Sequence, residues 1–162
     1  MCAMENSHTR FIELERKFLV TSEEWRDLGE GTDSSQGYLA SGGATVRVRV
    51  SHDAGFLTVK GPRSGISRLE FEYEIPIAEA RKMIAELAGD QIVYKTRYRI
   101  RLGDVVWEVD EFHGLNAGLV VAEVELESED QKLELPDWVG EEVTHDPRYG
   151  NASLSRHPFC EW

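Results

Sequence analysis

Two pairs of glutamates have the spacing of a site for a hard divalent cation. Glu13 and Glu15 lie two residues apart in the chain, and so do Glu123 and Glu125. On a β-strand, side chains two residues apart point to the same face, so both carboxylates of a pair can reach one ion. Carboxylate oxygens are ligands that such ions prefer, and the spacing therefore predicts a metal site built from two distant segments.

Basic residues show the same spacing in other segments. Arg47 and Arg49 alternate with valines, and the run KTRYRIR at 95–101 has a lysine or arginine at every second position. Arginine forks bind phosphate oxygens through paired hydrogen bonds, and Mg²⁺ is commonly held by a few carboxylates together with phosphate oxygens. A polyphosphate bound with metal is therefore the ligand that suits both residue sets. Nine of the chain's 18 lysines and arginines occupy such alternating positions: Lys17, Arg47, Arg49, Lys60, Arg68, Lys95, Arg97, Arg99 and Arg101.

Alternation of polar and apolar residues is the main pattern of the chain, and it predicts β-strands. The alternation recurs in short runs separated by glycine, proline, aspartate and serine, which is typical of an antiparallel barrel or sandwich. The serine-rich segment at 33–35 is expected to be a loop. The expected strands are residues 10–20, 35–40, 44–51, 55–61, 67–75, 93–102, 105–112 and 119–127.

Helical patterns are few. Thr21 and Glu24 have the spacing of a capping box in front of Trp25 and Leu28, which predicts a short helix there. Residues 77–88 place apolar side chains at helical spacing, and residues 151–156 are expected to form a short terminal helix. Both of the first two helices are expected to lie against the side of the sheet.

The charged faces of the strands have two structural explanations. An antiparallel sheet with one face in water would show the same alternation. Eight strands can also close into a barrel, and closure would turn the charged faces inward. A closed barrel removes many charges from water, and this costs free energy. The barrel is therefore reasonable only if a highly charged ligand and metal ions offset that cost. On the second explanation Arg47, Lys60, Arg97 and Glu123 line one cavity, whereas Val46, Val48, Val59, Ile100 and Val124 point outward.

Length and composition limit the class of protein. The 162 residues with a net charge of −12 fit one acidic globular domain, and argue against nonspecific binding to nucleic acid or to an anionic membrane. Cys2 and Cys160 lie at opposite ends and form no disulfide framework. The first residues lack the apolar core of a signal peptide, and no segment is long and apolar enough to span a bilayer. We therefore expect a cytoplasmic protein.

The order of motifs resembles the CYTH superfamily, the triphosphate tunnel metalloenzymes, and in particular its short bacterial members that are like inorganic triphosphatases. The run from Glu13 to Lys17 has the ExExK form of the first strand in that family. The likeness continues through QGYL at 36–39, RVR at 47–49, TVKG at 58–61, RLEFEYEI at 68–75, KTRYR at 95–99, WEVDEF at 107–112, AEVELE at 122–127 and YGNASL at 149–154.

This resemblance implies a fold and a domain organisation. The expected fold is α+β, mainly antiparallel β, with a closed eight-stranded barrel around a charged lumen and a few flanking helices. Residues 1–162 would form a single CYTH domain, with residues 1–9 as a flexible tail.

The resemblance also implies roles for individual residues. Glu70 and Glu72 are expected to orient arginines or a water molecule. The residues expected to hold metal are Glu13, Glu15, Glu123 and Glu125, helped by Asp110. The residues expected to hold phosphates are Lys17, Arg47, Arg49, Lys60, Lys95, Arg97 and Arg99.

The activity implied is hydrolysis of a small-molecule triphosphate, most simply inorganic tripolyphosphate, with Mg²⁺ or Mn²⁺ as cofactor. Alternatives on the same tunnel are a class IV adenylyl cyclase and a thiamine or nucleoside triphosphatase. No sequence feature indicates the adenine pocket that a cyclase needs. A noncatalytic polyphosphate-binding module is a further alternative, although a binder would not require the acidic metal positions.

Three arrangements are open for the general base. In the first arrangement Lys60 takes the proton, because arginines crowding it would lower its pKa. Alternation places Tyr38 near Lys60. Lys60 is equally suited to be a permanent phosphate clamp. In the third arrangement a metal-bound water loses its proton toward a carboxylate, and Glu13 and Glu125 complete the set of residues expected to act in catalysis.

Overall fold

The computed structural model describes residues 11–162, so the tail expected at residues 1–9 lies outside the described residues. The strands are, in chain order, β1 (Ile12–Val20), β2 (Gly31–Ala40), β3 (Thr45–Ser51), β4 (Ala54–Lys60), β5 (Ser67–Ile75), β6 (Ile92–Leu102), β7 (Val105–Phe112), β8 (Val120–Glu125) and β9 (Val139–Glu142). The helices are α1 (Ile77–Leu87), α2 (Asn151–Leu154) and the 3₁₀ helices η1 (Glu24–Leu28), η2 (Gly114–Asn116), η3 (Pro147–Tyr149) and η4 (Phe159–Glu161).

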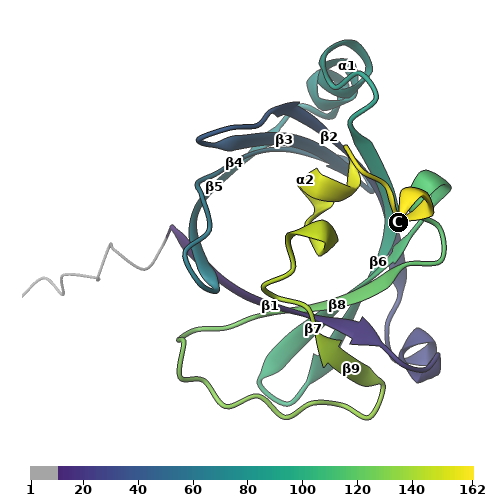
Figure 1. Ribbon diagram of the computed structural model, residues 1–162. Coiled ribbons are helices and arrows are strands. Elements are labelled where there is room, and N and C mark those ends of the chain that lie inside the picture. The colour runs from purple at the N-terminus through teal and green to yellow at the C-terminus, as the bar shows by residue number, and fades with distance from the viewer. Residues whose placement is uncertain (1–10) are drawn as a thin grey trace, which may run out of the picture.

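Eight antiparallel strands close into a barrel, as predicted (Figure 1). The strand order is β5-β4-β3-β2-β6-β7-β8-β1, and pairing of β1 with β5 closes the ring. Ile12 of β1 lies opposite Leu69 of β5, while Glu15 of β1 lies opposite Glu125 of β8. Closure satisfies the edges that an open sheet would leave unpaired. The ninth strand, β9, was not predicted; it pairs with the end of β1, beyond the part of β1 that contacts β5.

The side chains alternate between the lumen and the outside, as the sequence predicted. Val48 packs beneath α1, and Ile100 and Val124 belong to an outer apolar cluster around Trp107. This outer cluster is covered by Trp25 of η1 and by Trp138, which directly precedes β9. The apolar core therefore lies mainly outside the barrel wall, and the charged side chains are left to line the interior.

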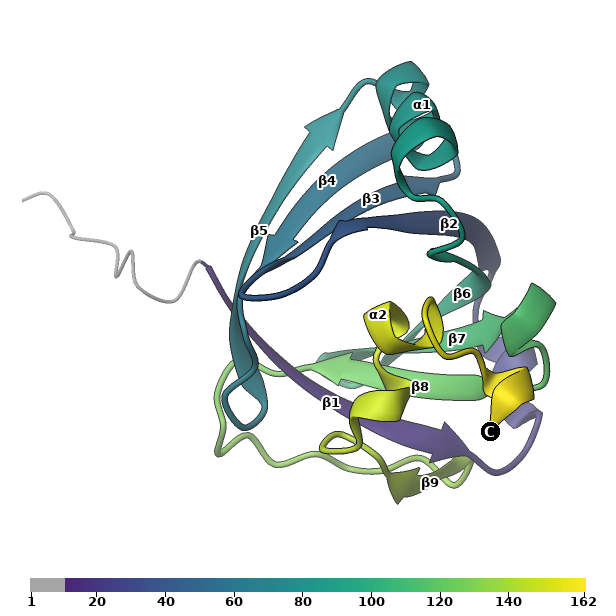
Figure 2. The ribbon, with the colours of Figure 1, turned by 45° about the horizontal axis from the view of Figure 1, so that its top comes forward.

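Helix α1 lies on the outer face of β2, β3 and β4, where its Ala80 and Ile84 pack on Val48 (Figure 2). The helix and the strand are in close contact, since a Cβ added at Gly55 would lie only 2.7 Å from the Ala80 Cβ. Glycine at this position therefore lets the helix approach the strand. Ala88 at the end of the helix is also buried, whereas Leu87 is exposed.

Two local predictions were wrong. The capping box does not form: η1 begins after Glu23 with no side-chain cap, and the Thr21 hydroxyl donates instead to the Asp137 carbonyl at 3.5 Å. Residues 33–35 are not a loop but part of β2: all three pair with β6, and Ser34 and Ser35 also pair with β3. The Thr96 hydroxyl donates to Asp33 at 2.6 Å across this pairing. Both differences arise because long-range pairing outweighs local turn preferences.

The C-terminal segment crosses one end of the barrel (Figures 1 and 2). Leu154 of α2 packs against Tyr38, Phe112 and Val121, whose side chains make this end of the interior apolar. The Asn116 side chain accepts from the Phe159 backbone N–H at 2.8 Å and thereby ties the segment to the turn between β7 and β8. This segment therefore acts as a plug, which we define as residues 147–161. Within residues 11–162, no helix is long and apolar enough to cross a membrane.

Candidate active site

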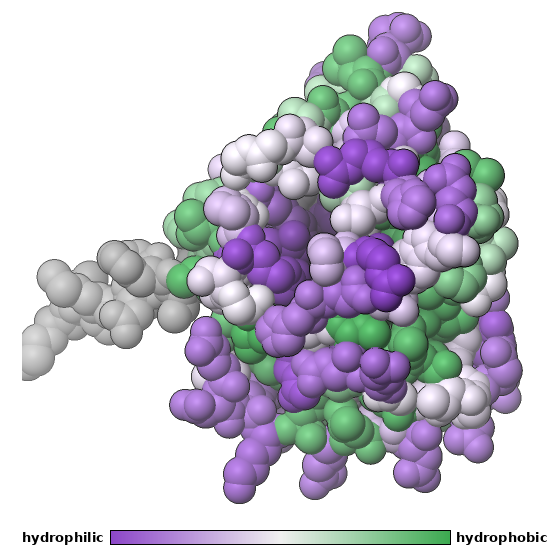
Figure 3. Space-filling model, in the orientation of Figure 1, coloured by the Kyte–Doolittle hydropathy of each residue, from purple (hydrophilic) through white to green (hydrophobic). Residues whose placement is uncertain are grey.

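The barrel encloses a cavity of about 870 Å³ whose lining includes residues from all eight barrel strands and from the plug. Figure 3 shows hydrophilic side chains around a hollow on the face that carries α2. Arg47, Lys60, Arg97 and Glu123 all line this one cavity, as expected for a lumen. Every predicted site residue except Asp110 lines it: Glu13, Glu15, Lys17, Tyr38, Arg47, Arg49, Lys60, Lys95, Arg97, Arg99, Glu123 and Glu125.

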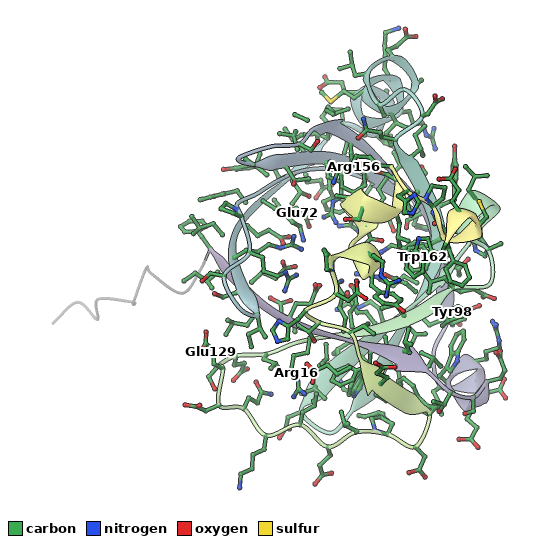
Figure 4. The ribbon with its side chains drawn as sticks, viewed as in Figure 1. Arg16, Glu72, Tyr98, Glu129, Arg156 and Trp162 are labelled. Carbon is green, nitrogen blue, oxygen red and sulfur yellow. The ribbon has the colours of Figure 1, made fainter. Side chains whose placement is uncertain are left out.

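An arginine pair on β3 is held by one glutamate of β5. Arg47 and Arg49 each place Nη2 near the Glu72 carboxylate, at 3.1 and 3.3 Å. Thr58 also donates to Glu72, at 2.9 Å, and Figure 4 shows Glu72 at the barrel interior. The predicted role of Glu72 in orienting arginines is thus confirmed. Burial and the neighbouring Arg47 lower the pKa of Arg49.

The same two arginines keep unused donors. The Nε atoms of Arg47 and Arg49 are buried and have no hydrogen-bond partner within the described part of the chain. A buried donor without a partner costs free energy, so the site favours a ligand that brings acceptors. Oxygens of a phosphate group are such acceptors, and an arginine fork can take two of them.

Lys60 has different neighbours from those predicted. Its Nζ lies 3.0 Å from Glu13 and 2.7 Å from Glu70, so it sits between two carboxylates and not among arginines. The expectation that arginines crowd Lys60 is therefore wrong. Glu70 pairs with this lysine and not with an arginine. Burial would raise the pKa of Glu13, but Lys60 and Arg68 outweigh it and hold that pKa well below its usual range.

Lys17 lies at the centre of another carboxylate group. Its Nζ is 2.9 Å from Glu15 and also donates to Glu123. Burial alone would lower the pKa of Lys17, yet Glu123 and Glu15 raise it well above its ordinary value. Lys17 therefore stays charged at neutral pH, and an anion that contacted it would share it with these two carboxylates.

Asp110 is fully buried and does not line the cavity. One of its oxygens accepts from Arg97 Nε at 2.6 Å, and the other accepts from Arg97 Nη2 at 2.7 Å and from Lys95 at 2.5 Å. Both oxygens are thus used to hold cations, which differs from the metal-binding role predicted from sequence. Burial, with Arg97 nearby, lowers the pKa of Lys95 to about 8.

Tyr38 is separated from Lys60 by the strand register. Tyr38 lies opposite Arg47, whereas Lys60 lies opposite Thr45. Its hydroxyl accepts from Gln36 at 2.9 Å, and burial raises the pKa of Tyr38 to about 12. At neutral pH this hydroxyl keeps its proton, so Tyr38 is not a base.

Glu125 is the carboxylate best placed to receive a metal ion. It has no ion pair within residues 11–162, and it lies opposite Glu15 in the register of β1 and β8. Burial, followed by Glu13, Glu108 and Glu15, raises the pKa of Glu125. A cluster of negative charges with one unpaired carboxylate fits a hard divalent cation, which such oxygens prefer.

The carboxylates are not gathered into a ready metal cage. Within the described residues, no three acidic, histidine or cysteine side chains converge closely enough to hold an ion as they stand. Glu15 already contacts Lys17, and the Arg63 guanidinium lies 3.1 Å from the same carboxylate. An ion bound between Glu15 and Glu125 would therefore compete with these cations.

Some cavity residues were missed or under-weighted by sequence reasoning. Asn151 and Arg156 reach the cavity from the plug, which no strand pattern could indicate. Asn151 belongs to the motif YGNASL, and its side chain lies 3.5 Å from Lys95, so that motif was the available signal.

Arg99 is largely exposed and lies 3.5 Å from Glu108, whereas Arg101 does not line the cavity.

The fold and the cavity together define a class of protein: a closed antiparallel barrel with a highly charged lumen. The chain belongs to the CYTH domain family, whose model matches residues 12–158. It is 47% identical over 148 residues to an inorganic triphosphatase of Acetivibrio thermocellus, which covers 91% of this chain and 95% of the relative. It is 36% identical to an inorganic triphosphatase of Nitrosomonas europaea, over 88% of this chain and 96% of that protein.

Solved structures agree with the fold. The crystal structure of the inorganic triphosphatase NE1496 superposes with a TM-score of 0.63 at 35% identity, covering 88% of this chain and 93% of the other. A putative adenylate cyclase from Bacillus halodurans gives a TM-score of 0.59 at 21% identity, over 74% of this chain and 82% of the other. The second likeness supports the fold alone. The predicted family and fold are thus confirmed.

Proposed function

We propose that this protein hydrolyses inorganic tripolyphosphate inside the barrel, with a divalent cation, Mg²⁺ or Mn²⁺, as cofactor. Two relatives at 47% and 36% identity carry the name inorganic triphosphatase. The observation that carries the proposal is the pair of buried Nε donors on Arg47 and Arg49, which have no hydrogen-bond partner within residues 11–162. They indicate that the lumen is built for an anion with several oxygens.

Hydrolysis of a phosphoanhydride requires charge stabilisation and a positioned water more than covalent chemistry. Arg47 and Arg49 would bind phosphate oxygens, and Glu72 fixes their direction. Lys60 would neutralise charge on the substrate while Glu13 and Glu70 hold it in place. These contacts also position the substrate for in-line attack by water, because they fix several phosphate oxygens at once.

The carboxylates Glu13, Glu15, Glu123 and Glu125 would hold the cation. Such an ion supplies Lewis-acid stabilisation of phosphate charge when it is bound. Asp110 serves this site indirectly, because it holds Lys95 and Arg97 in the lumen wall.

Among the candidate bases, the geometry supports a carboxylate. Tyr38 keeps its proton at neutral pH, and Lys60 is enclosed by two carboxylates. Glu125 has no ion pair within the described residues, so an oxygen of this carboxylate that the cation does not use would be free to accept a proton from water. Lys60 then acts as the phosphate clamp.

The test is phosphate release from tripolyphosphate, ATP, thiamine triphosphate and pyrophosphate with Mg²⁺ and with Mn²⁺, with cyclic AMP measured in the ATP reactions. Release mainly from tripolyphosphate supports the proposal. Cyclic AMP as the main product would indicate the cyclase alternative, and preferential release from ATP or thiamine triphosphate would indicate a different triphosphatase. Binding of tripolyphosphate without turnover would indicate a noncatalytic module.

A further inference from the structure

Arg156 lies just beyond α2, on the plug, and lines the cavity (Figure 4). Its Nε donates to the Ala152 carbonyl at 3.1 Å, and its Nη1 donates to the Ser41 hydroxyl at 3.2 Å. Leu154 anchors the plug in the apolar end of the barrel. The guanidinium is therefore held at the cavity edge by two neutral acceptors, between the plug and the turn that joins β2 to β3.

Arg156 differs from the other cavity cations in its charge balance. Within residues 11–162, every other lysine or arginine that lines the cavity has a carboxylate within 4.0 Å, whereas Arg156 has none. Its positive charge is thus not compensated locally. The other cations share their charge with the glutamates and aspartate of the wall.

This difference has an energetic consequence for anion binding. A paired lysine or arginine must weaken a charge-assisted hydrogen bond before it can bind a phosphate. Arg156 has to exchange only hydrogen bonds to neutral oxygens, which are weaker. Arg156 is one of ten cations that line the cavity. Because it is unpaired, it contributes more to anion binding than any one of the paired cations.

We infer that Arg156 is a further phosphate-binding residue, supplied by the plug and not by a barrel strand. The inference rests on the proposed function, since it names how the same cavity recognises its substrate. Coulomb attraction grows with ligand charge, so Arg156 favours tripolyphosphate over the less charged pyrophosphate. The plug thereby takes part in substrate selection as well as covering one end of the barrel.

The test measures binding of tripolyphosphate and of pyrophosphate by calorimetry in EDTA, where no turnover occurs. Arg156→Gln is expected to weaken tripolyphosphate about tenfold, the loss typical of one charge-assisted hydrogen bond, and pyrophosphate less. Ser41→Ala removes one neutral acceptor and keeps the charge of Arg156. The affinity of this variant for tripolyphosphate is therefore expected to stay within about twofold of the wild-type value. Arg156→Lys keeps the charge without the fork and should lose less affinity than the glutamine variant.

A matched control is Arg81→Gln, which removes the same charge from the exposed side of α1. Equal affinities for Arg156→Gln and Arg81→Gln would overturn the inference. Equal losses in Arg156→Gln and Ser41→Ala, with lowered melting temperatures in both, would show that Arg156 only anchors the plug and would also overturn it.

The proposed function and this inference fail in different ways. If the wild-type protein binds tripolyphosphate but does not hydrolyse it, the proposed function is wrong, and the affinities above still decide the role of Arg156. If the enzyme hydrolyses tripolyphosphate and Arg156→Gln changes neither affinity nor KM, the inference alone is wrong. If the wild-type protein neither binds nor hydrolyses tripolyphosphate when Mg²⁺ or Mn²⁺ is present, both are wrong.

Discussion

Glu15 and Glu125 are paired across β1 and β8, yet Glu15 has cations as its neighbours whereas Glu125 has carboxylates. Glu15 contacts Lys17 at 2.9 Å and Arg63 at 3.1 Å, whereas Glu125 has no ion pair within residues 11–162. Three other glutamates raise the pKa of Glu125 in addition to burial. One side of the lumen is thus short of positive charge, and this is where we place the cation.

Replacement of Glu125 should abolish turnover and leave the fold intact. Glu125→Gln removes a metal ligand, and we expect activity on tripolyphosphate to fall about a hundredfold or more. The melting temperature in EDTA should stay the same or rise, because repulsion with Glu13, Glu15 and Glu108 is relieved. Glu127→Gln, two residues further along and outside the cavity lining, is the matched control. Near-normal activity of Glu125→Gln at saturating metal would contradict the metal assignment.

The raised pKa of Glu125 also predicts a pH dependence of stability. The folded protein holds this proton more tightly than the unfolded chain, whose ordinary value is 4.5. The Glu125 contribution to stability should therefore be lost as pH rises through 4.5 and the raised pKa. In metal-free buffer the melting temperature of Glu125→Gln relative to wild type should increase over this pH range. A difference that is constant from pH 4 to pH 7 would refute the raised pKa.

Replacement of Asp110 should give the opposite result to replacement of Glu125. Asp110→Ala leaves Lys95 without an ion-pair partner in the described part of the chain and removes one of the three carboxylates that contact Arg97, which should cost about 3 kcal/mol of stability. Denaturant unfolding measures this loss, and Asp104→Ala in an exposed turn should change stability by about 0.5 kcal/mol or less. If Asp110→Ala is as stable as wild type but has lost metal affinity, Asp110 is a metal ligand after all.

Arg49 should matter more for a longer phosphate chain. Arg49→Ala removes one fork from the β3 wall, and we expect a rise of about tenfold in KM for tripolyphosphate, with a smaller change for pyrophosphate. Arg49→Lys should recover only part of the loss, because lysine keeps the charge but not the planar fork. Steady-state kinetics with both substrates measures this. Equal losses for the two substrates would be evidence that Arg49 does not contact the part of tripolyphosphate that pyrophosphate lacks.

Alternation in the sequence predicted the side of each strand that carries charge, and the resemblance to the CYTH superfamily predicted that the strands close into a barrel. Closure of the barrel brings together the charged faces that alternation had identified. One cavity is therefore lined by Arg47, Lys60, Arg97 and Glu123. Local signals failed where distant pairing decides the structure, as at residues 33–35.

The partners of individual charges could not be predicted. Lys60 meets Glu13 and Glu70 because of the register of β1, β4 and β5, which a single sequence does not encode locally. For the same reason Asp110 could not be distinguished from a metal ligand. The plug was also missed, since Leu154 fills an apolar end of the barrel that exists only after closure.

The central claim is that the lumen hydrolyses tripolyphosphate with a divalent cation. The most direct measurement is phosphate release from tripolyphosphate by EDTA-treated enzyme, before and after addition of excess Mg²⁺ or Mn²⁺. We predict no release above background in EDTA and recovery of turnover with metal, with Glu125→Gln inactive in both conditions. Full activity of thoroughly metal-stripped enzyme, or no release with any metal, would contradict the claim.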